Sequence, residues 1–199
     1  IDSPNKDKVV IELNHKSPII LHNIVCDELT IEVMNYRIPG YIIKDKEALV
    51  SLDQLSKSDT CTIHKNSKLL TDFVLQEYST TMLNLFSNYM TCGQNHSLSL
   101  YKGNPSIPLT KNYRDTLLIQ PLSGKVILYV FNPKHEKDIK GLEPTSIKKW
   151  SIKIDVDKGD LLYIPPEWLY FYESTKEVIL MHSECDSYPT FVFNYLRKK

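Results

Sequence analysis

The sequence predicts a mainly β fold of the jelly-roll or double-stranded β-helix type, with strands and a helix from the N-terminal part packed on it. Three observations lead to this prediction. Beyond residue 97, segments rich in β-branched and aromatic residues follow one another without a long helical pattern between them. Trp150, Ile152, Ile154 and Val156 alternate strictly with polar residues, which is the period of a strand. Alanine, the best helix former, occurs only at Ala48.

The C-terminal half of the chain should contain eight short antiparallel strands. They are expected at residues 98–101, 116–120, 126–130, 147–156, 161–164, 170–173, 178–181 and 190–195. Residues 132–149 carry prolines, a glycine and many charges, which indicates an extended surface loop. We therefore assign residues 97–199 to the barrel core and residues 1–96 to flanking elements of the same domain.

The N-terminal part should supply strands and one amphipathic helix that support the barrel. Strands are expected at residues 9–13, 19–25, 29–33 and 41–43, after a polar lead-in over residues 1–8. Between Ser67 and Met90 the apolar residues recur at intervals of three and four, which predicts a helix, with a break near Ser79–Thr81. Its apolar stripe is expected to pack on the outside of a sheet.

Length and charge limit the classes of function. A chain of 199 residues fits one domain. Its 24 Lys and Arg residues balance 24 Asp and Glu residues, so no nucleic-acid partner is expected. No apolar run approaches the ~20 residues of a membrane-spanning helix, so no membrane segment is expected in this chain. The four cysteines form no metal-site spacing and are expected to be free thiols.

The composition also bears on the source. Frequent Lys, Asn, Ile, Tyr and Ser, with three Arg and one Ala, are typical of an AT-rich coding sequence, such as that of a large DNA virus, a protist parasite or an AT-rich bacterium. We expect a protein of the cytoplasm, or of a virion or its host's cytoplasm. The chain starts at Ile1, which leaves an upstream anchor or signal open.

Two motifs stand out in the predicted barrel. One is Gly159-Asp160-Leu161-Leu162-Tyr163-Ile164-Pro165-Pro166-Glu167-Trp168-Leu169-Tyr170. The other runs from Tyr101 through Gly103, Pro108-Leu109 and Asp115 to Gln120 and Ser123-Gly124-Lys125. Together they resemble the JmjC and cupin-like oxygenases, and the resemblance covers roughly residues 97–196. It implies a double-stranded β-helix and, in the enzymes of that superfamily, an Fe(II) ion with 2-oxoglutarate.

The resemblance places Thr110, Asn112 and Tyr170 where the three iron ligands stand. An iron site of this class needs two neutral imidazoles and a carboxylate. Thr and Asn offer only neutral oxygens, and a tyrosine with a pKa of about 10 must first lose its proton. No metal, cofactor or catalytic residue is therefore expected.

The superfamily usually holds 2-oxoglutarate with a lysine just after the Ser-Gly turn, which points to Lys125. A lysine in register would face into the barrel, whereas one residue out of register would face outward. The register near Pro121 leaves both possibilities open.

A displaced site is the first alternative. Asp115, His96 and His182 would hold Fe(II) for a 2-oxoglutarate-dependent hydroxylase in this hypothesis. The second alternative is a cupin that binds a small polar molecule without metal. The residues expected to line the candidate pocket are Tyr101, Thr110, Asn112, Asp115, Lys125, Trp168, Tyr170, Tyr172 and His182.

We favour a third hypothesis, a non-catalytic domain in which aromatic side chains fill the former pocket. Tyrosine is bulkier than histidine, and a core without a ligand fills its voids. Such a pseudoenzyme would serve as a structural or protein-interaction module, with a protein partner or a second copy of itself.

Overall fold

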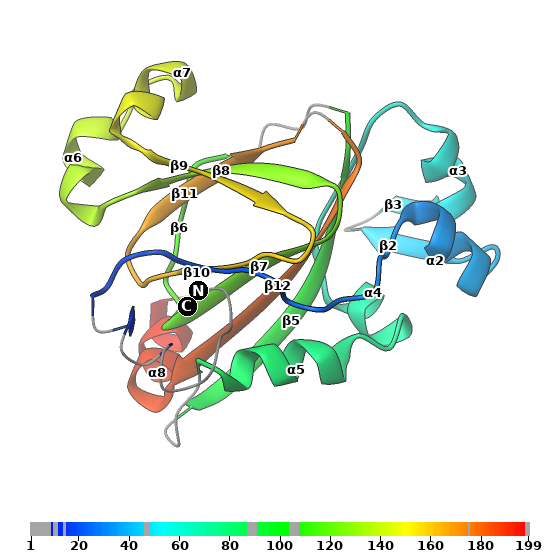
Figure 1. The fold of residues 1–199 in the computed structure, drawn as a ribbon, viewed down its shortest axis with the longest axis horizontal. Coiled ribbons are helices and arrows are strands. Elements are labelled where there is room, and N and C mark those ends of the chain that lie inside the picture. Colours follow the sequence, from blue (N-terminus) through cyan, green and yellow to red (C-terminus); the bar gives the residue numbers. More distant parts are fainter. Residues whose placement is uncertain are drawn as a thin grey trace.

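The computed structural model describes residues 9, 12, 13, 15–45, 48–86, 91–103, 108–174 and 176–197. In this part of the chain two antiparallel sheets face each other across a shared core (Figure 1). The larger sheet has the strand order β1-β10-β7-β12-β5-β4, and the smaller sheet has the order β6-β11-β8-β9. Strands β2 and β3 form a separate hairpin.

The strands have the following bounds. They are β1 Ile19–Leu21, β2 Ile42–Asp45, β3 Ala48–Ser51, β4 Cys61–Asn66, β5 Thr91–Lys102, β6 Thr110–Lys111, β7 Thr116–Ser123, β8 Lys125–Phe131, β9 Ile152–Asp157, β10 Leu161–Ile164, β11 Leu169–Glu173 and β12 Val178–Ser187.

The order in which the chain visits the two sheets identifies the fold. Strands β5, β7, β10 and β12 belong to the larger sheet, and β6, β8, β9 and β11 belong to the smaller one. The eight strands therefore form the two interleaved four-stranded sheets of a jelly roll, or double-stranded β-helix. Strands β1 and β4, from the N-terminal part, extend the larger sheet at its two edges.

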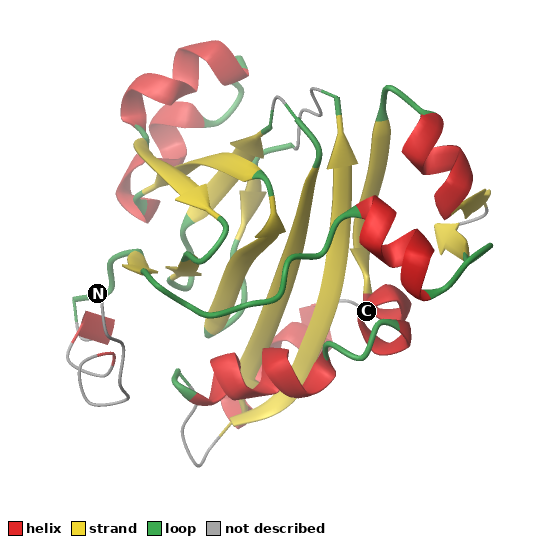
Figure 2. Cartoon of the chain, turned by 45° about the vertical axis from the view of Figure 1, so that its right-hand side comes forward, coloured by secondary structure: helices red, strands yellow, loops and turns green. Residues whose placement is uncertain are grey.

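Helices cover the outside of both sheets (Figure 2). They are α2 Ile31–Arg37, α3 Leu52–Lys57, α4 Ser67–Asp72, α5 Gln76–Asn84, η1 Pro133–His135, α6 Glu136–Ile139, α7 Pro144–Ile147, η2 Lys148–Trp150 and α8 Tyr188–Arg197. Leu83 of α5, together with Phe86, packs on Leu118 and Tyr163 of the larger sheet. The α5 stripe therefore covers the outer face of that sheet, as expected.

Both faces of the central strands of the smaller sheet, β8 and β11, are buried, which explains their almost continuous apolar sequences. Val126, Leu128 and Val130 of β8 point into the core between the sheets. Tyr129 and Phe131 point to the other side, where the segment η1–η2 covers them through residues such as Ile139 and Ile147. Period two thus places successive side chains in two different cores. The predicted loop at 132–149 carries short helices for this reason.

Two predicted strands near the N-terminus are wrong. Residues 29–33 alternate in polarity, but α2 begins there. Thr30 caps the helix by accepting a hydrogen bond from the Val33 amide, and Ile31 and Met34 share its buried face. The local cap and the spacing of three outweigh the alternation. In the predicted strand 9–13, the described residues 9, 12 and 13 are helical.

The predicted last strand, residues 190–195, is also wrong because α8 occupies it. Asp115 accepts hydrogen bonds from the Ser187 amide (2.6 Å) and the Thr190 hydroxyl (2.9 Å), which fixes the start of the helix. Asn194 is buried one turn further on, whereas Phe193 is exposed. The polar side chains of α8 therefore face the protein and its apolar side chains face outward. The strand was predicted because the apolar residues of this segment are those typical of strands.

The remaining differences concern boundaries and missed elements. The helix expected over 67–90 divides into α4 and α5 at residues 73–75, and Ser79–Thr81 lies inside α5; residues 87–90 lie outside the described residues. Strands β3 and β4 and helix α3 were not predicted, and the strand expected over 147–156 begins only at Ile152. The strand expected over 19–25 is limited to β1. All four cysteines are free thiols, as predicted.

Candidate functional site

A small cavity of about 180 Å³ opens at one end of the barrel. The three residues that the sequence resemblance aligns with iron ligands, Thr110, Asn112 and Tyr170, all line it. The other residues around it are Lys65, Lys111, Tyr113, Arg114, Leu117 and Glu184. The structure thus brings the three aligned positions together, beside charged residues that the sequence did not single out.

Asn112 uses its whole amide to join two segments of the barrel. Its Nδ2 donates to the carbonyl oxygens of Ile164 (2.8 Å) and Pro165 (3.0 Å), and its Oδ1 accepts from the Arg114 amide (2.9 Å). Its backbone amide donates to the Trp168 carbonyl oxygen (2.8 Å). A carboxylate here would face two carbonyl oxygens with no proton to donate. The position fits an amide and does not fit an anionic metal ligand.

Thr110 and Tyr170 are also unsuited to bind a cation. The Thr110 hydroxyl donates to the Pro108 carbonyl oxygen at 2.9 Å. Tyr170 is 3% exposed, and burial raises the pKa of its hydroxyl; the Lys65 ammonium opposes this rise and Glu184 adds to it. The phenol therefore stays protonated at neutral pH. No anionic ligand atom comes from any of the three positions.

Three ion pairs lie at the cavity, and both of their carboxylates belong to one strand, β12. Glu184 of β12 pairs with Lys65 and accepts from Arg114 Nε at 3.2 Å. Asp186, two residues further along β12, pairs with the same guanidinium. Burial alone would raise the pKa of Glu184, but Lys65 and Arg114 outweigh burial, so its pKa lies below the ordinary value. We refer to Lys65, Arg114, Glu184 and Asp186 as the mouth cluster.

Deeper in the barrel, aromatic rings fill the space below the cavity. Tyr101, Trp168, Tyr170 and Tyr172 are buried in the core between the two sheets. The hydroxyls of Tyr101 and Tyr172 are hydrogen bonded at 2.7 Å, and Tyr101 also bonds to His64 Nδ1. These four residues belong to one buried cluster, in which the rings of Tyr101 and Tyr172 are in edge contact.

His182 lies in the same interior. Its Nε2 is 3.1 Å from the Ser99 hydroxyl, and its Nδ1 has no hydrogen-bond partner among the described residues. Burial lowers the pKa of His182 well below its ordinary value, and Lys65 and His64 lower it further. The imidazole is therefore neutral in the folded protein.

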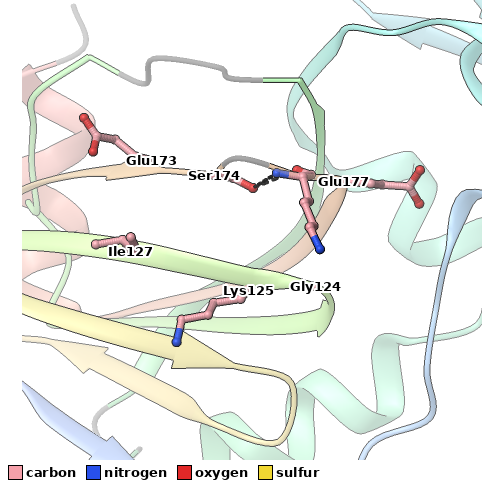
Figure 3. Close-up of a pocket in the computed structure, with 7 residues that line it drawn as sticks. Gly124, Lys125, Ile127, Glu173, Ser174 and Glu177 are labelled. Atoms are coloured by element: carbon pink, nitrogen blue, oxygen red, sulfur yellow. Dashed lines mark hydrogen bonds between the residues drawn. The ribbon is translucent and has the colours of Figure 1, made fainter.

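Lys125 lies apart from the other predicted pocket residues. Half of its side chain is exposed, and its ammonium is 3.4 Å from Asp157 and 4.0 Å from Asp155, both on β9. It borders a separate surface groove of about 470 Å³ with Ile127 and Glu173 (Figure 3). The two possibilities for its register are thus resolved in favour of the outward one.

The three residues of the displaced metal site do not converge. Asp115 binds the start of α8, as described above. His96 bonds to the hydroxyl of Ser183 at 3.1 Å, and Ser183 points to the face of β12 opposite to His182. In the described ranges, no group of three His, Cys, Asp or Glu residues is placed to hold a metal ion.

The polar residues at this end of the barrel differ in how clearly the sequence pattern indicates that they are buried. His182, Glu184 and Asp186 alternate along an apolar strand and so share one face, which is a detectable signal for a buried polar site. Lys65 gives no such signal, because the strand that carries it was not predicted.

No family model matches the chain, and no curated protein matches it. Among solved structures, a cupin superfamily protein from Desulfitobacterium hafniense is similar with a TM-score of 0.36 and 14% identity, over 47% of this chain and 68% of that protein. In the described part of the chain, no helix is long and apolar enough to cross a membrane.

We predict that Asn112→Asp lowers the free energy of unfolding by about 3 kcal/mol, because a buried carboxylate would face two carbonyl oxygens. Urea denaturation measures the change. Asn132→Asp is the matched control, since among the described residues the side chain of Asn132 bonds only through its Oδ1, which accepts from the Lys134 amide. Equal stability of the two variants would contradict the role given to Asn112.

We also predict that the protein loses stability as the pH falls below about 6.5, the value for an unfolded histidine. The unfolded chain then binds a proton that the buried, neutral His182 does not bind, so stability is full above this pH and decreases below it. Between pH 7.5 and 5 the loss should be about 1–2 kcal/mol from this group.

Urea denaturation across this pH range tests the prediction. His182→Gln should flatten the profile, whereas His15→Gln, at an exposed position, should leave it unchanged. His96, whose pKa burial also lowers, contributes in the same direction. A profile that His182→Gln leaves as steep as before would refute the assignment.

Proposed function

We propose that this chain is a non-catalytic domain of the JmjC-like kind that serves as a structural or protein-interaction module. The observation that carries the proposal is that the residues at the aligned ligand positions already form hydrogen bonds within the protein or are buried in a neutral form. The amide of Asn112 is fully hydrogen bonded within the protein, and Tyr170 is a buried phenol beside an ammonium group. A cation at this point would find no anionic ligand among the three positions and would face Lys65.

The exposed side of α8 supports an interaction role. Six of its apolar side chains, among them Tyr188, Phe193 and Leu196, keep between 38% and 65% of their surface exposed. The aromatic residues alone leave roughly 400 Å² in water, which reaches the size of the largest apolar patch on a typical monomer. A second copy of the chain is the partner we propose, because an isologous contact buries the same patch on both copies.

Two other functions receive less support. The cavity of about 180 Å³ is lined by hydrogen-bonding groups and favours a metal-free site for a small polar molecule as the second candidate. A hydroxylase with a displaced iron site would need Asp115, His96 and His182 to approach one another, although His182 lies in the barrel interior and His96 contacts the opposite face of β12. The amino-acid composition, which is typical of an AT-rich coding sequence, supports a source such as a large DNA virus. The module would then act in the virus particle or in the cytoplasm of the host.

We predict that the purified chain binds neither Fe(II) nor Mn(II) at stoichiometric levels, with or without 2-oxoglutarate. Elemental analysis after anaerobic loading and dialysis gives the metal content, and thermal denaturation should show no rise in melting temperature. Stoichiometric metal, or turnover of 2-oxoglutarate, would overturn the non-catalytic proposal. A rise in melting temperature with small polar molecules alone would favour the second candidate instead.

We further predict that the chain self-associates through α8. Sedimentation velocity over a wide concentration range should show a dimer, and the double variant Phe193→Ser/Leu196→Ser should be monomeric because it removes two of the most exposed apolar side chains. Tyr36→Ser is the control, since Tyr36 is 87% exposed on α2. A native chain that stays monomeric throughout would exclude the second copy as the partner.

A further inference from the structure

A β-bulge in β4 directs Lys65 into the barrel. Ile63 pairs with Leu100 and Asn66 pairs with Leu98, so three steps along β4 correspond to two along β5. Lys65, within the bulge, has a φ of 49°, a left-handed conformation that is uncommon for any residue other than glycine. Bulges of this kind redirect a side chain and are frequent next to functional sites.

The bulge is held by a specific contact. The Lys65 amide donates to the Ser99 hydroxyl at 2.8 Å, in place of a ladder hydrogen bond, and Ser99 also contacts His182. A backbone held in a sparsely populated conformation persists only where its surroundings determine it. The surroundings of Lys65 are Ser99 and His182 of the barrel interior. The strained backbone conformation of Lys65 is therefore coupled to the entry of its side chain into the barrel.

The side chain ends in the cavity that Thr110, Asn112 and Tyr170 line. Its ammonium pairs with one oxygen of Glu184, while Arg114 takes the other. Only 28% of the Lys65 side chain and 7% of the Glu184 side chain are exposed. A buried carboxylate of this kind requires a cation close by, and removal of that cation is strongly destabilising.

We infer that the Lys65 ammonium is a covalently attached cation that occupies the place of a metal ion at this end of the barrel, with Glu184 and Tyr170 arranged around it. The inference rests on the proposed non-catalytic function and names the group that replaces the metal. It also assigns the N-terminal strand β4 a role in the site. With the side chain of Lys65 removed, the same place becomes a binding site for a primary alkylammonium ion.

Chemical rescue tests this inference. Lys65→Ala should lower the melting temperature by about 10 °C, because Glu184 keeps only Arg114 as its counter-ion. Millimolar n-propylammonium or n-butylammonium should restore at least half of that loss in the variant and leave the native chain unchanged. Tetramethylammonium and sodium chloride at equal ionic strength should restore nothing, since neither can donate a hydrogen bond to Glu184.

Two further variants serve as controls. Lys57→Ala removes an exposed ion pair with Asp53 and should change the melting temperature little, with no response to alkylammonium. Lys65→Gly removes the side chain and relieves the left-handed strain, and it should still be less stable than the native chain. A Lys65→Gly variant at least as stable as the native chain would overturn the inference.

If the Lys65→Ala chain does not fold, a double variant still tests the inference. The double variant Lys65→Ala/Glu184→Gln also removes the carboxylate that has lost one of its two counter-ions, and it should fold, with no alkylammonium rescue. Equal destabilisation with and without Glu184 as a carboxylate would also refute the inference. The non-catalytic proposal fails on a different result, namely stoichiometric metal in the native chain, so the two failures are distinguishable.

Discussion

The structure at this end of the barrel depends on supplying cations to two buried carboxylates on β12. Glu184 is 6% exposed and Asp186 is fully buried, and a carboxylate removed from water is tolerated only with cations and hydrogen bonds around it. Lys65 and Arg114 supply the charge from two separate elements, β4 and the loop after β6. The mouth cluster therefore ties the N-terminal strand and that loop to the strand that lies between β5 and β7 in the larger sheet.

The same condition determines what chemistry the site can support. A metal centre with open positions needs ligand atoms whose lone pairs are not already used, on side chains that tolerate a neighbouring dication. Here Asn112 bonds to backbone on both sides of its amide, and the Lys65 ammonium lines the cavity. Hydrogen bonds and ion pairs within the chain satisfy these groups, and the ring packing of Tyr101 and Tyr172 closes the interior below them.

The mouth cluster also connects to the outer surface through α8. Asp186 accepts from Asn194 Nδ2 at 3.3 Å, and the same Nδ2 donates to the Tyr113 carbonyl oxygen at 2.8 Å. Arg197 lies over the Tyr113 ring with its guanidinium carbon 3.3 Å from the ring centroid. Because the polar residues of α8 are needed on the inside, its apolar residues face outward. Satisfying a buried charge thus decides which side chains α8 exposes.

The sequence by itself determined the sandwich of β strands, since period-two alternation and turn residues are local signals that a strand such as β9 or β10 carries without help. The motif resemblance also predicted that Thr110, Asn112 and Tyr170 lie near one another, and in the structure all three line one cavity. The sequence pattern misassigned α2 and α8, where a cap at Thr30 and a distant carboxylate at Asp115 decide the conformation. Only the tertiary structure decided the position of Lys65. A bulge depends on the register between two strands, and the sequence of one strand does not determine how it pairs with another.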